Sequence, residues 1–193
     1  TDPNVAIPDN SANQRADWRE YWPMRNYLLD TPLEDNTFYG FLSPKFTSKT
    51  GLSGADVIRF MDAHPQADVF TFSPQADMGA FFLNVFIQGK TFDPGLLEVC
   101  EELFSHIGQP VDLRSLVMDS RQVVFSNFIV AKPAFWYEWL ALCEKIFALA
   151  EADDSPFASR INAPTTYPGQ VSRKVFIIER VASLLLARGS WHC

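Results

Sequence analysis

The sequence predicts an α/β domain in which a small, mostly parallel sheet is flanked by many helices. Two short apolar segments, residues 38–42 and 68–72, are rich in aromatic side chains, and each ends in a Ser-Pro pair. A helical pattern over residues 53–63 separates them, and strand, helix and strand in this order typically form parallel neighbours. Ser43 and Ser73 should therefore lie together at one edge of the sheet.

Length, composition and charge define the class of protein. At 193 residues with 47% apolar residues, the chain is expected to fold as one globular domain over residues 1–193, with residues 1–16 as an irregular lead-in. A net charge of -7 opposes binding to nucleic acid or to an anionic membrane surface. No apolar run approaches the roughly 20 residues that span a bilayer, and residues 1–10 do not resemble a signal peptide. Three cysteines without metal-ligand or redox spacing indicate buried thiols in a reducing compartment, so a cytoplasmic location is expected.

The helices can be placed from their capping residues and apolar periodicity. Asp17 and Glu20 resemble a capping box for a helix to about Leu29, and Ser53 with Asp56 resembles a second. Residues 80–88 are apolar nearly all round, which predicts a buried helix that stops at Gly89. Other segments with a helical pattern are residues 93–106, 112–118 (a short turn), 133–150 and 171–188. Phe82, Phe135, Trp139 and Ile178 are predicted core residues.

Polar residues follow the first two strands and interrupt a third. Hydroxyl and ammonium groups at the end of a buried strand are a common way to build a site in an open α/β sheet, although a solvated loop is the alternative interpretation. A third strand is expected over residues 122–131, and its amide at Asn127 either holds neighbouring backbone or faces a ligand. Arg19 and Arg25 are candidate phosphate ligands, or else they form surface ion pairs.

Familiar catalytic motifs are missing from the sequence. It contains no G-x-G-x-x-G, no phosphate loop, no G-x-S-x-G and no H-E-x-x-H. It also lacks the D-x-D pair with which many nucleotide-sugar transferases hold a divalent metal. The three histidines are scattered, so no metal site is predicted.

Four segments nevertheless resemble a known group of proteins. Residues 18–25 (WREYWPMR) and 39–46 (YGFLSPKF) are similar to bacterial glycosyltransferase-like domains encoded among polysaccharide and cell-surface sugar genes. Residues 125–132 with 138–140, and residues 176–181, look like that group's N-M-F-I-M-K, E-W-L and F-x-x-E-R-L motifs. The histidine and second basic residue of the group's first motif are absent here.

This resemblance implies a glycosyltransferase A-like fold and transfer of a sugar from a nucleotide-diphosphate donor to a saccharide or cell-surface acceptor. The chain starts where the group's first nucleotide-binding strand would just have ended, so that strand is diverged within residues 1–10 or the chain is part of a larger protein with other domains. The positions expected to bind the donor are Lys45, Ser43, Ser73, Lys49, Arg19 and Arg25.

Under this hypothesis a lysine, rather than a metal ion, neutralises the departing diphosphate, and the need for a divalent metal stays open. Asp119 or Asp77 is the expected catalytic base, and Asn127 is expected to bind sugar hydroxyls. The competing hypothesis is a non-catalytic module that kept the fold and binds a sugar or a partner domain.

Overall fold

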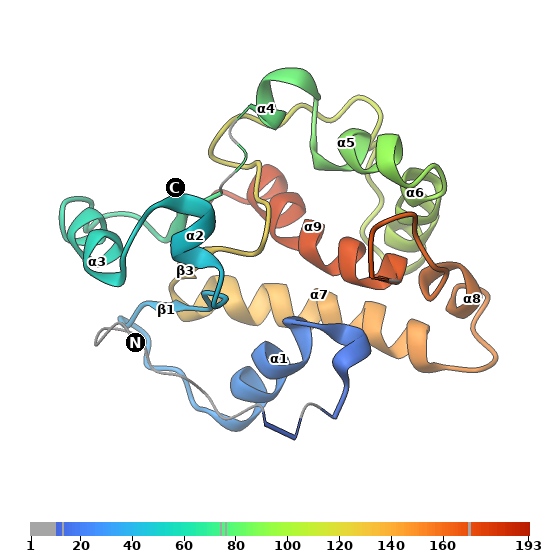
Figure 1. Cartoon of the computed structure of the whole chain (residues 1–193), viewed down its shortest axis with the longest axis horizontal. Helices are drawn as coiled ribbons and strands as arrows, with labels where there is room; N and C mark the ends of the chain where they lie inside the picture. Colours follow the sequence, from blue (N-terminus) through green and yellow to red (C-terminus); the bar gives the residue numbers. More distant parts are fainter. Residues whose placement is uncertain (1–10, 13, 74, 76, 170) are drawn as a thin grey trace.

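The computed structural model describes residues 11–193 except Asn13, Pro74, Ala76 and Gln170. About half of the described chain is helical, and the sheet is small (Figure 1). The elements in chain order are η1 Ala16–Trp18, α1 Tyr21–Asp30, β1 Tyr39–Gly40, α2 Phe46–Thr50, α3 Gly54–Asp62, β2 Val69–Thr71, α4 Met78–Phe81, α5 Val85–Phe92, α6 Leu96–His106, β3 Ile129–Ala131, α7 Pro133–Glu151, α8 Ala158–Ile161 and α9 Arg173–Arg188.

The predicted mostly parallel sheet, and with it the glycosyltransferase A-like fold, is wrong. The described sheet has three strands in the order β1-β3-β2, and β3 pairs antiparallel with both neighbours. The two Ser-Pro strands are therefore not neighbours. The helix between them implied a β-α-β unit, but a strand from much later in the chain takes the central position.

The main core lies among helices rather than against a sheet. Helices α7 and α9 lie side by side across the middle of the molecule, with α1 on one side and α5 and α6 on the other (Figure 1). Phe135, Trp139 and Ile178 are buried as predicted, whereas Phe82 is only half-buried. A second, smaller cluster of buried residues covers the sheet: Phe46, Val57, Ala67, Phe70, Phe128 and Val130.

Local signals were reliable where a side chain caps its own helix. Ser53 and Asp56 form the predicted capping box of α3, and α7 starts at Pro133 as expected. The capping box predicted at Asp17 does not form, because the Asp17 carboxylate binds Arg15 and Lys174 instead.

The buried helix predicted over residues 80–88 is also wrong. Helix α4 ends at Phe81, whose side chain is 81% exposed, and α5 starts only at Val85. The cause is Asn84, whose side-chain oxygen accepts hydrogen bonds from the backbone N–H groups of Phe86 and Ile87 and so begins a new helix. An apolar run conceals such a break because Asn has both helical and capping conformations available.

One further boundary differs from the sequence pattern: the strand predicted over residues 122–131 is reduced to β3. Residues 112–118 contain the single turn predicted there, in which the Leu116 N–H donates to the Asp112 carbonyl at 3.1 Å. The segment between α7 and α9 contains the short helix α8. Within the described residues, no helix has the length and apolar character needed to cross a membrane.

Helix α5 approaches α9 closely at a glycine. The Arg180 guanidinium is buried and donates hydrogen bonds to the Val85 carbonyl at 2.8 Å and the Gln88 side-chain oxygen at 2.8 Å, both on α5. A Cβ on Gly89 would lie 2.8 Å from Arg180 Nε and would overlap Leu96. Gly89 thus lies inside α5, not at a helix stop as its sequence context suggested, and its missing side chain leaves room for the arginine.

Replacing Gly89 with Ala should destabilise the protein despite the better helix propensity of alanine. Helix propensity would add at most about 1 kcal/mol, but overpacking against Arg180 and Leu96 costs about 1–3 kcal/mol. We expect the free energy of unfolding, measured by urea denaturation, to fall by up to about 2 kcal/mol. Gly79→Ala in α4 is the matched control, because its Cβ would meet only Val123 at 3.8 Å. Equal or higher stability of Gly89→Ala would contradict the close approach.

Candidate functional site

β1 and β2 both leave the sheet at the end where β3 begins. β1 pairs Tyr39 with Ala131, and β2 pairs Val69 with the same residue. The hydrogen bond from the Phe72 N–H to the Phe128 carbonyl, at 2.8 Å, continues the β2–β3 pairing toward Asn127. Because β1 and β2 both run antiparallel to β3, their Ser-Pro ends leave the sheet toward the same end, with β3 between them.

The chain enters β3 through a tight turn at Ser126 and Asn127. Both residues have left-handed backbone angles, with φ of 65° and 51°. Such angles cost about 1–2 kcal/mol for a residue with a Cβ, although Asn tolerates them better than most. Neither residue is glycine, so surrounding contacts must hold the turn in place.

Three hydrogen bonds from other elements hold the backbone before and at this turn. The N–H of Ser126 donates to the Glu179 carboxylate at 2.6 Å, and the N–H of Phe125 donates to the Ser73 hydroxyl at 3.1 Å. One residue earlier, the N–H of Val124 donates to the Ser183 hydroxyl at 2.9 Å. Ser73, predicted as a donor-binding residue, thus has a structural contact at this site.

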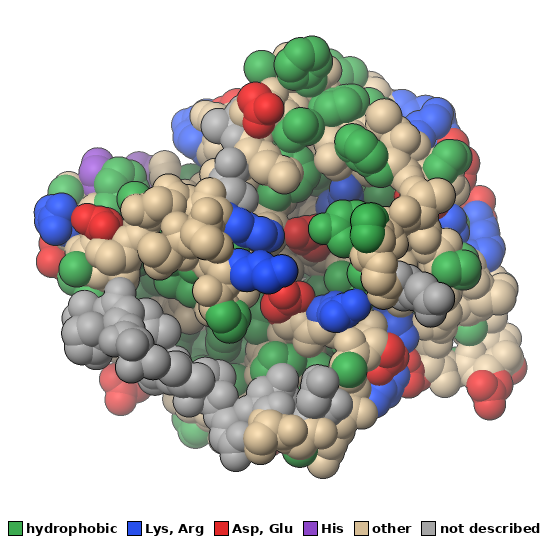
Figure 2. Space-filling model, viewed as in Figure 1, with side chains coloured by type: hydrophobic (Ala, Val, Ile, Leu, Met, Phe, Trp, Pro, Cys, Tyr) green, Lys and Arg blue, Asp and Glu red, His purple; other side chains and the backbone are tan. Residues whose placement is uncertain are grey.

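Lys49, on α2, contacts the same turn as Glu179 does. Helix α2 is seated by buried Phe46, and Lys49 Nζ donates to Ser126 Oγ at 2.8 Å while lying 5.6 Å from the centre of the Phe128 ring. An ammonium and a carboxylate, from Lys49 and Glu179, therefore flank the Ser126–Asn127 turn. Basic and acidic side chains lie beside one another near the middle of this face, where the surface is hollowed (Figure 2).

The Asn127 side chain has unused hydrogen-bonding capacity. Its Oδ1 is shielded from solvent and has no partner among the described residues. A buried amide oxygen without a partner is uncommon, because leaving it unpaired costs about 1–3 kcal/mol. The sequence left two roles open for the Asn127 side chain. It makes no hydrogen bond to neighbouring backbone among the described residues, and a contact with a ligand stays a prediction. We name the group Lys49, Ser73, Ser126, Asn127 and Glu179 the turn cluster.

Ser43 and Lys45 come shortly before Lys49, a member of the turn cluster, in the sequence. Ser43 Oγ accepts a hydrogen bond from the Lys45 backbone N–H at 3.3 Å, which shapes the entry into α2. The Lys45 side chain is exposed. These two residues and Lys49 stand on one short segment, as the sequence predicted.

The other predicted site residues belong to different environments. Asp119 forms an exposed ion pair with Arg121, in which Arg121 Nε lies 3.1 Å from Asp119 Oδ2. This contact lowers the pKa of Asp119. The Asp77 side chain is exposed just before α4. Arg25 is bound to Glu144 on α7, with Nε 2.6 Å from Oε1, and the ion pair raises the pKa of Arg25. Arg25 thus connects α1 to α7.

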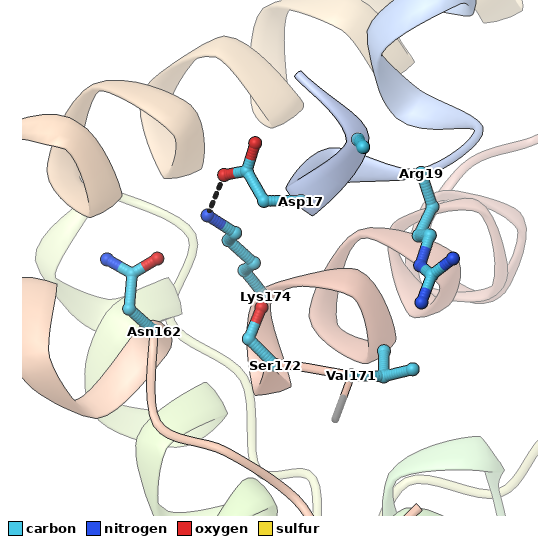
Figure 3. A pocket seen from close by; sticks show the side chains of 7 residues that line it. Asp17, Arg19, Asn162, Val171, Ser172 and Lys174 are labelled. Carbon is cyan, nitrogen blue, oxygen red and sulfur yellow. Dashed lines mark hydrogen bonds and ion pairs between the residues drawn. The ribbon is translucent and has the colours of Figure 1, made fainter. Parts of the chain in front are cut away.

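Arg19 lines a pocket of about 290 Å³ between η1 and the start of α9. Within it, buried Lys174 donates to the Asp17 carboxylate at 2.6 Å and lies 4.5 Å from the centre of the Trp18 ring. The Asp17–Lys174 pair stands on one side of the pocket and the Arg19 guanidinium on the other (Figure 3). The residues that line this pocket are Ala16, Asp17, Arg19, Asn162, Val171, Ser172 and Lys174.

Two members of the turn cluster, Glu179 and Ser126, were not predicted as site residues. Glu179 is a charged residue in the largely apolar pattern of the last helix, and Ser126 is a polar residue within the predicted third strand. A charged residue inside an apolar face is a detectable signal, but its partner comes from a segment 53 residues away in the chain.

The described residues form no recognisable metal site beside the turn cluster. Within residues 11–193, apart from the undescribed positions, no set of three or more His, Cys, Asp or Glu residues is arranged to hold a metal ion. Comparison with protein-family models, curated proteins and solved structures finds no match to the chain. Function must therefore be inferred from the geometry of the turn cluster.

The Asp17 carboxylate gives a prediction for the pH dependence of stability. Hydrogen bonds from Arg15 and from Lys174 hold its pKa well below the usual value near 3.9. A depressed native pKa stabilises the fold above the unfolded-state pKa, and this contribution is lost as the pH falls through and below about 4. Asp17→Asn should lower the unfolding temperature at pH 7, where Lys174 loses its nearer carboxylate and keeps Glu151 at 4.0 Å. It should also flatten the change in stability between pH 5 and pH 2. Thermal unfolding of both proteins across this range measures the effect, and parallel profiles would contradict it.

Proposed function

We propose that this protein is glycosyltransferase-like and transfers a sugar from a nucleotide-diphosphate donor to a saccharide or cell-surface acceptor at the turn cluster. The observation that carries the proposal is the convergence of Lys49, Asn127 and Glu179 on one turn. Glycosyl transfer needs a positive charge for the leaving diphosphate, a group that binds sugar hydroxyls and a carboxylate for the acceptor proton. The cluster contains one of each.

Lys49 is the cation that meets the diphosphate in this proposal, with Lys45 beside it on the same segment. An ammonium on a flexible stem can leave Ser126 and follow the charge of the departing group, since its present hydrogen bond is to a neutral hydroxyl at an exposed position. A positive charge lowers the activation free energy most when it lies where negative charge develops in the transition state.

Glu179 is the proposed general base, in place of Asp119 or Asp77. One of its oxygens accepts from the Ser126 backbone, and the other is left for a ligand hydroxyl. The acceptor oxygen attacks the anomeric carbon, the bond from that carbon to the diphosphate oxygen breaks, and the acceptor proton passes to the Glu179 carboxylate. The nucleoside diphosphate leaves with the bonding electron pair. The buried oxygen of Asn127 accepts a hydrogen bond from a sugar hydroxyl.

A non-catalytic sugar- or partner-binding module is the second candidate. It is favoured by the exposure of both Lys45 and Lys49, because transition-state electrostatics act most strongly in a site that excludes water. The same three groups would then bind sugar hydroxyls and an anionic substituent without transfer.

Two substitutions test the proposed roles separately. Lys49→Met keeps the apolar stem and removes the charge, so affinity for nucleotide-diphosphate sugars should fall at least tenfold, about 1.4 kcal/mol. Glu179→Gln keeps an acceptor for the Ser126 N–H, so donor binding should persist while turnover falls about 100-fold or more. Binding is measured by calorimetry over a panel of nucleotide sugars, with and without Mn²⁺, and turnover by release of nucleoside diphosphate.

Lys145→Met is the matched control, since Lys145 is exposed on α7 and donates to a carbonyl of Ile107. It should bind and react like the parent. If Lys49→Met binds every donor as well as the parent does, Lys49 has no such role. If the parent binds free saccharides but no nucleotide sugar, the binding-module function replaces the transferase.

A further inference from the structure

The pocket between η1 and the start of α9 is separate from the turn cluster in its residues and its chemistry. Its volume of about 290 Å³ is at the lower end of the roughly 300–1,000 Å³ found for small-molecule sites. A phosphate group with a small substituent fits such a volume, whereas a complete nucleotide sugar does not.

We propose that this pocket binds a small phosphorylated ligand through the Arg19 guanidinium and the Ser172 hydroxyl. Both groups line the pocket, and both have hydrogen-bonding capacity to spare. Arg19 makes no side-chain hydrogen bond or ion pair with any described residue, and Ser172 does not use its hydroxyl to cap α9. A guanidinium presents a fork of N–H donors that matches phosphate oxygens.

The acidic residue in the pocket wall does not exclude an anion. Asp17 is bound by Lys174 at 2.6 Å and by Arg15 at 3.0 Å, and Arg15 also binds Glu151 at 2.7 Å. These two cations balance the two carboxylates. Arg19 is then an uncompensated positive charge at this pocket, and the first turn of α9 adds its positive dipole end.

The backbone at Arg19 supports a role for its side chain. Arg19 has a φ of 50° and a ψ of -132°, a conformation in which glycine is preferred. The position follows η1 directly and leads into α1, so a turn alone would be made more easily by Gly. The exposed Arg19 guanidinium has no partner among the described residues, so it is free to contact a ligand that enters the pocket.

Calorimetric titration with inorganic phosphate, pyrophosphate and glucose 1-phosphate tests the proposal, with acetate as a carboxylate probe. The parent should bind at least one phosphate probe saturably and more tightly than acetate. Arg19→Gln should lower that affinity at least tenfold, and Ser172→Ala should lower it several-fold. Arg59→Gln is the matched control, since Arg59 is an exposed arginine on α3 that pairs only with Asp56, and it should bind like the parent.

Arg19→Gly separates ligand binding from folding. It should lose phosphate binding while unfolding at the same temperature as the parent or higher, because glycine relieves the backbone conformation. The proposal is overturned if the parent binds no phosphate probe, if Arg19→Gln binds as tightly as the parent, or if Arg19→Gly unfolds at a clearly lower temperature. It does not rest on glycosyl transfer.

Discussion

The buried guanidinium of Arg180 is the constraint on which the arrangement of helices depends. A charge taken out of water must be met by acceptors, and burial lowers the pKa of Arg180. Its acceptors are the Val85 carbonyl, the Phe176 carbonyl and the Gln88 side chain, at 2.8 to 2.9 Å. Two of the three lie on α5, so α9 can pack against α5 in only one rotation and at one height. Gly89 supplies the space for that approach.

The rotation of α9 in turn fixes the central strand. Glu179 and Ser183 are four residues apart and so lie on the same face of α9. They accept hydrogen bonds from the N–H groups of Ser126 and Val124. The segment that begins β3 is therefore attached to α9 before it enters the sheet, and β3 is the strand to which β1 and β2 both pair. The order of the sheet follows from a helix that is far away in sequence.

This long-range dependence explains which features could be predicted from the sequence. Caps and periodic helices, such as the Ser53 box and the helix that starts at Pro133, depend on residues within a few positions, and they were predictable. The strand order depends on Glu179 meeting Ser126, and a sequence pattern contains no information on such a pair. Asn84 shows the same limit on a smaller scale, because an apolar run predicts burial but not the point where one helix stops and another starts. At the candidate site, Lys49 and Asn127 were predictable from residue type and strand endings, whereas Glu179 was not.

Backbone conformation links the two polar sites. Among the described residues, Arg19, Ser126 and Asn127 are the non-glycine residues with positive φ. Ser126 and Asn127 form the turn between Lys49 and Glu179, and Arg19 lines the pocket at the start of α9. Glycine would relieve the backbone at each position, so the side chains present there must offset the strain through what they contact. For Ser126 that contact is Lys49. The Asn127 oxygen has no partner among the described residues, whereas the exposed Arg19 guanidinium is open to solvent and to a ligand.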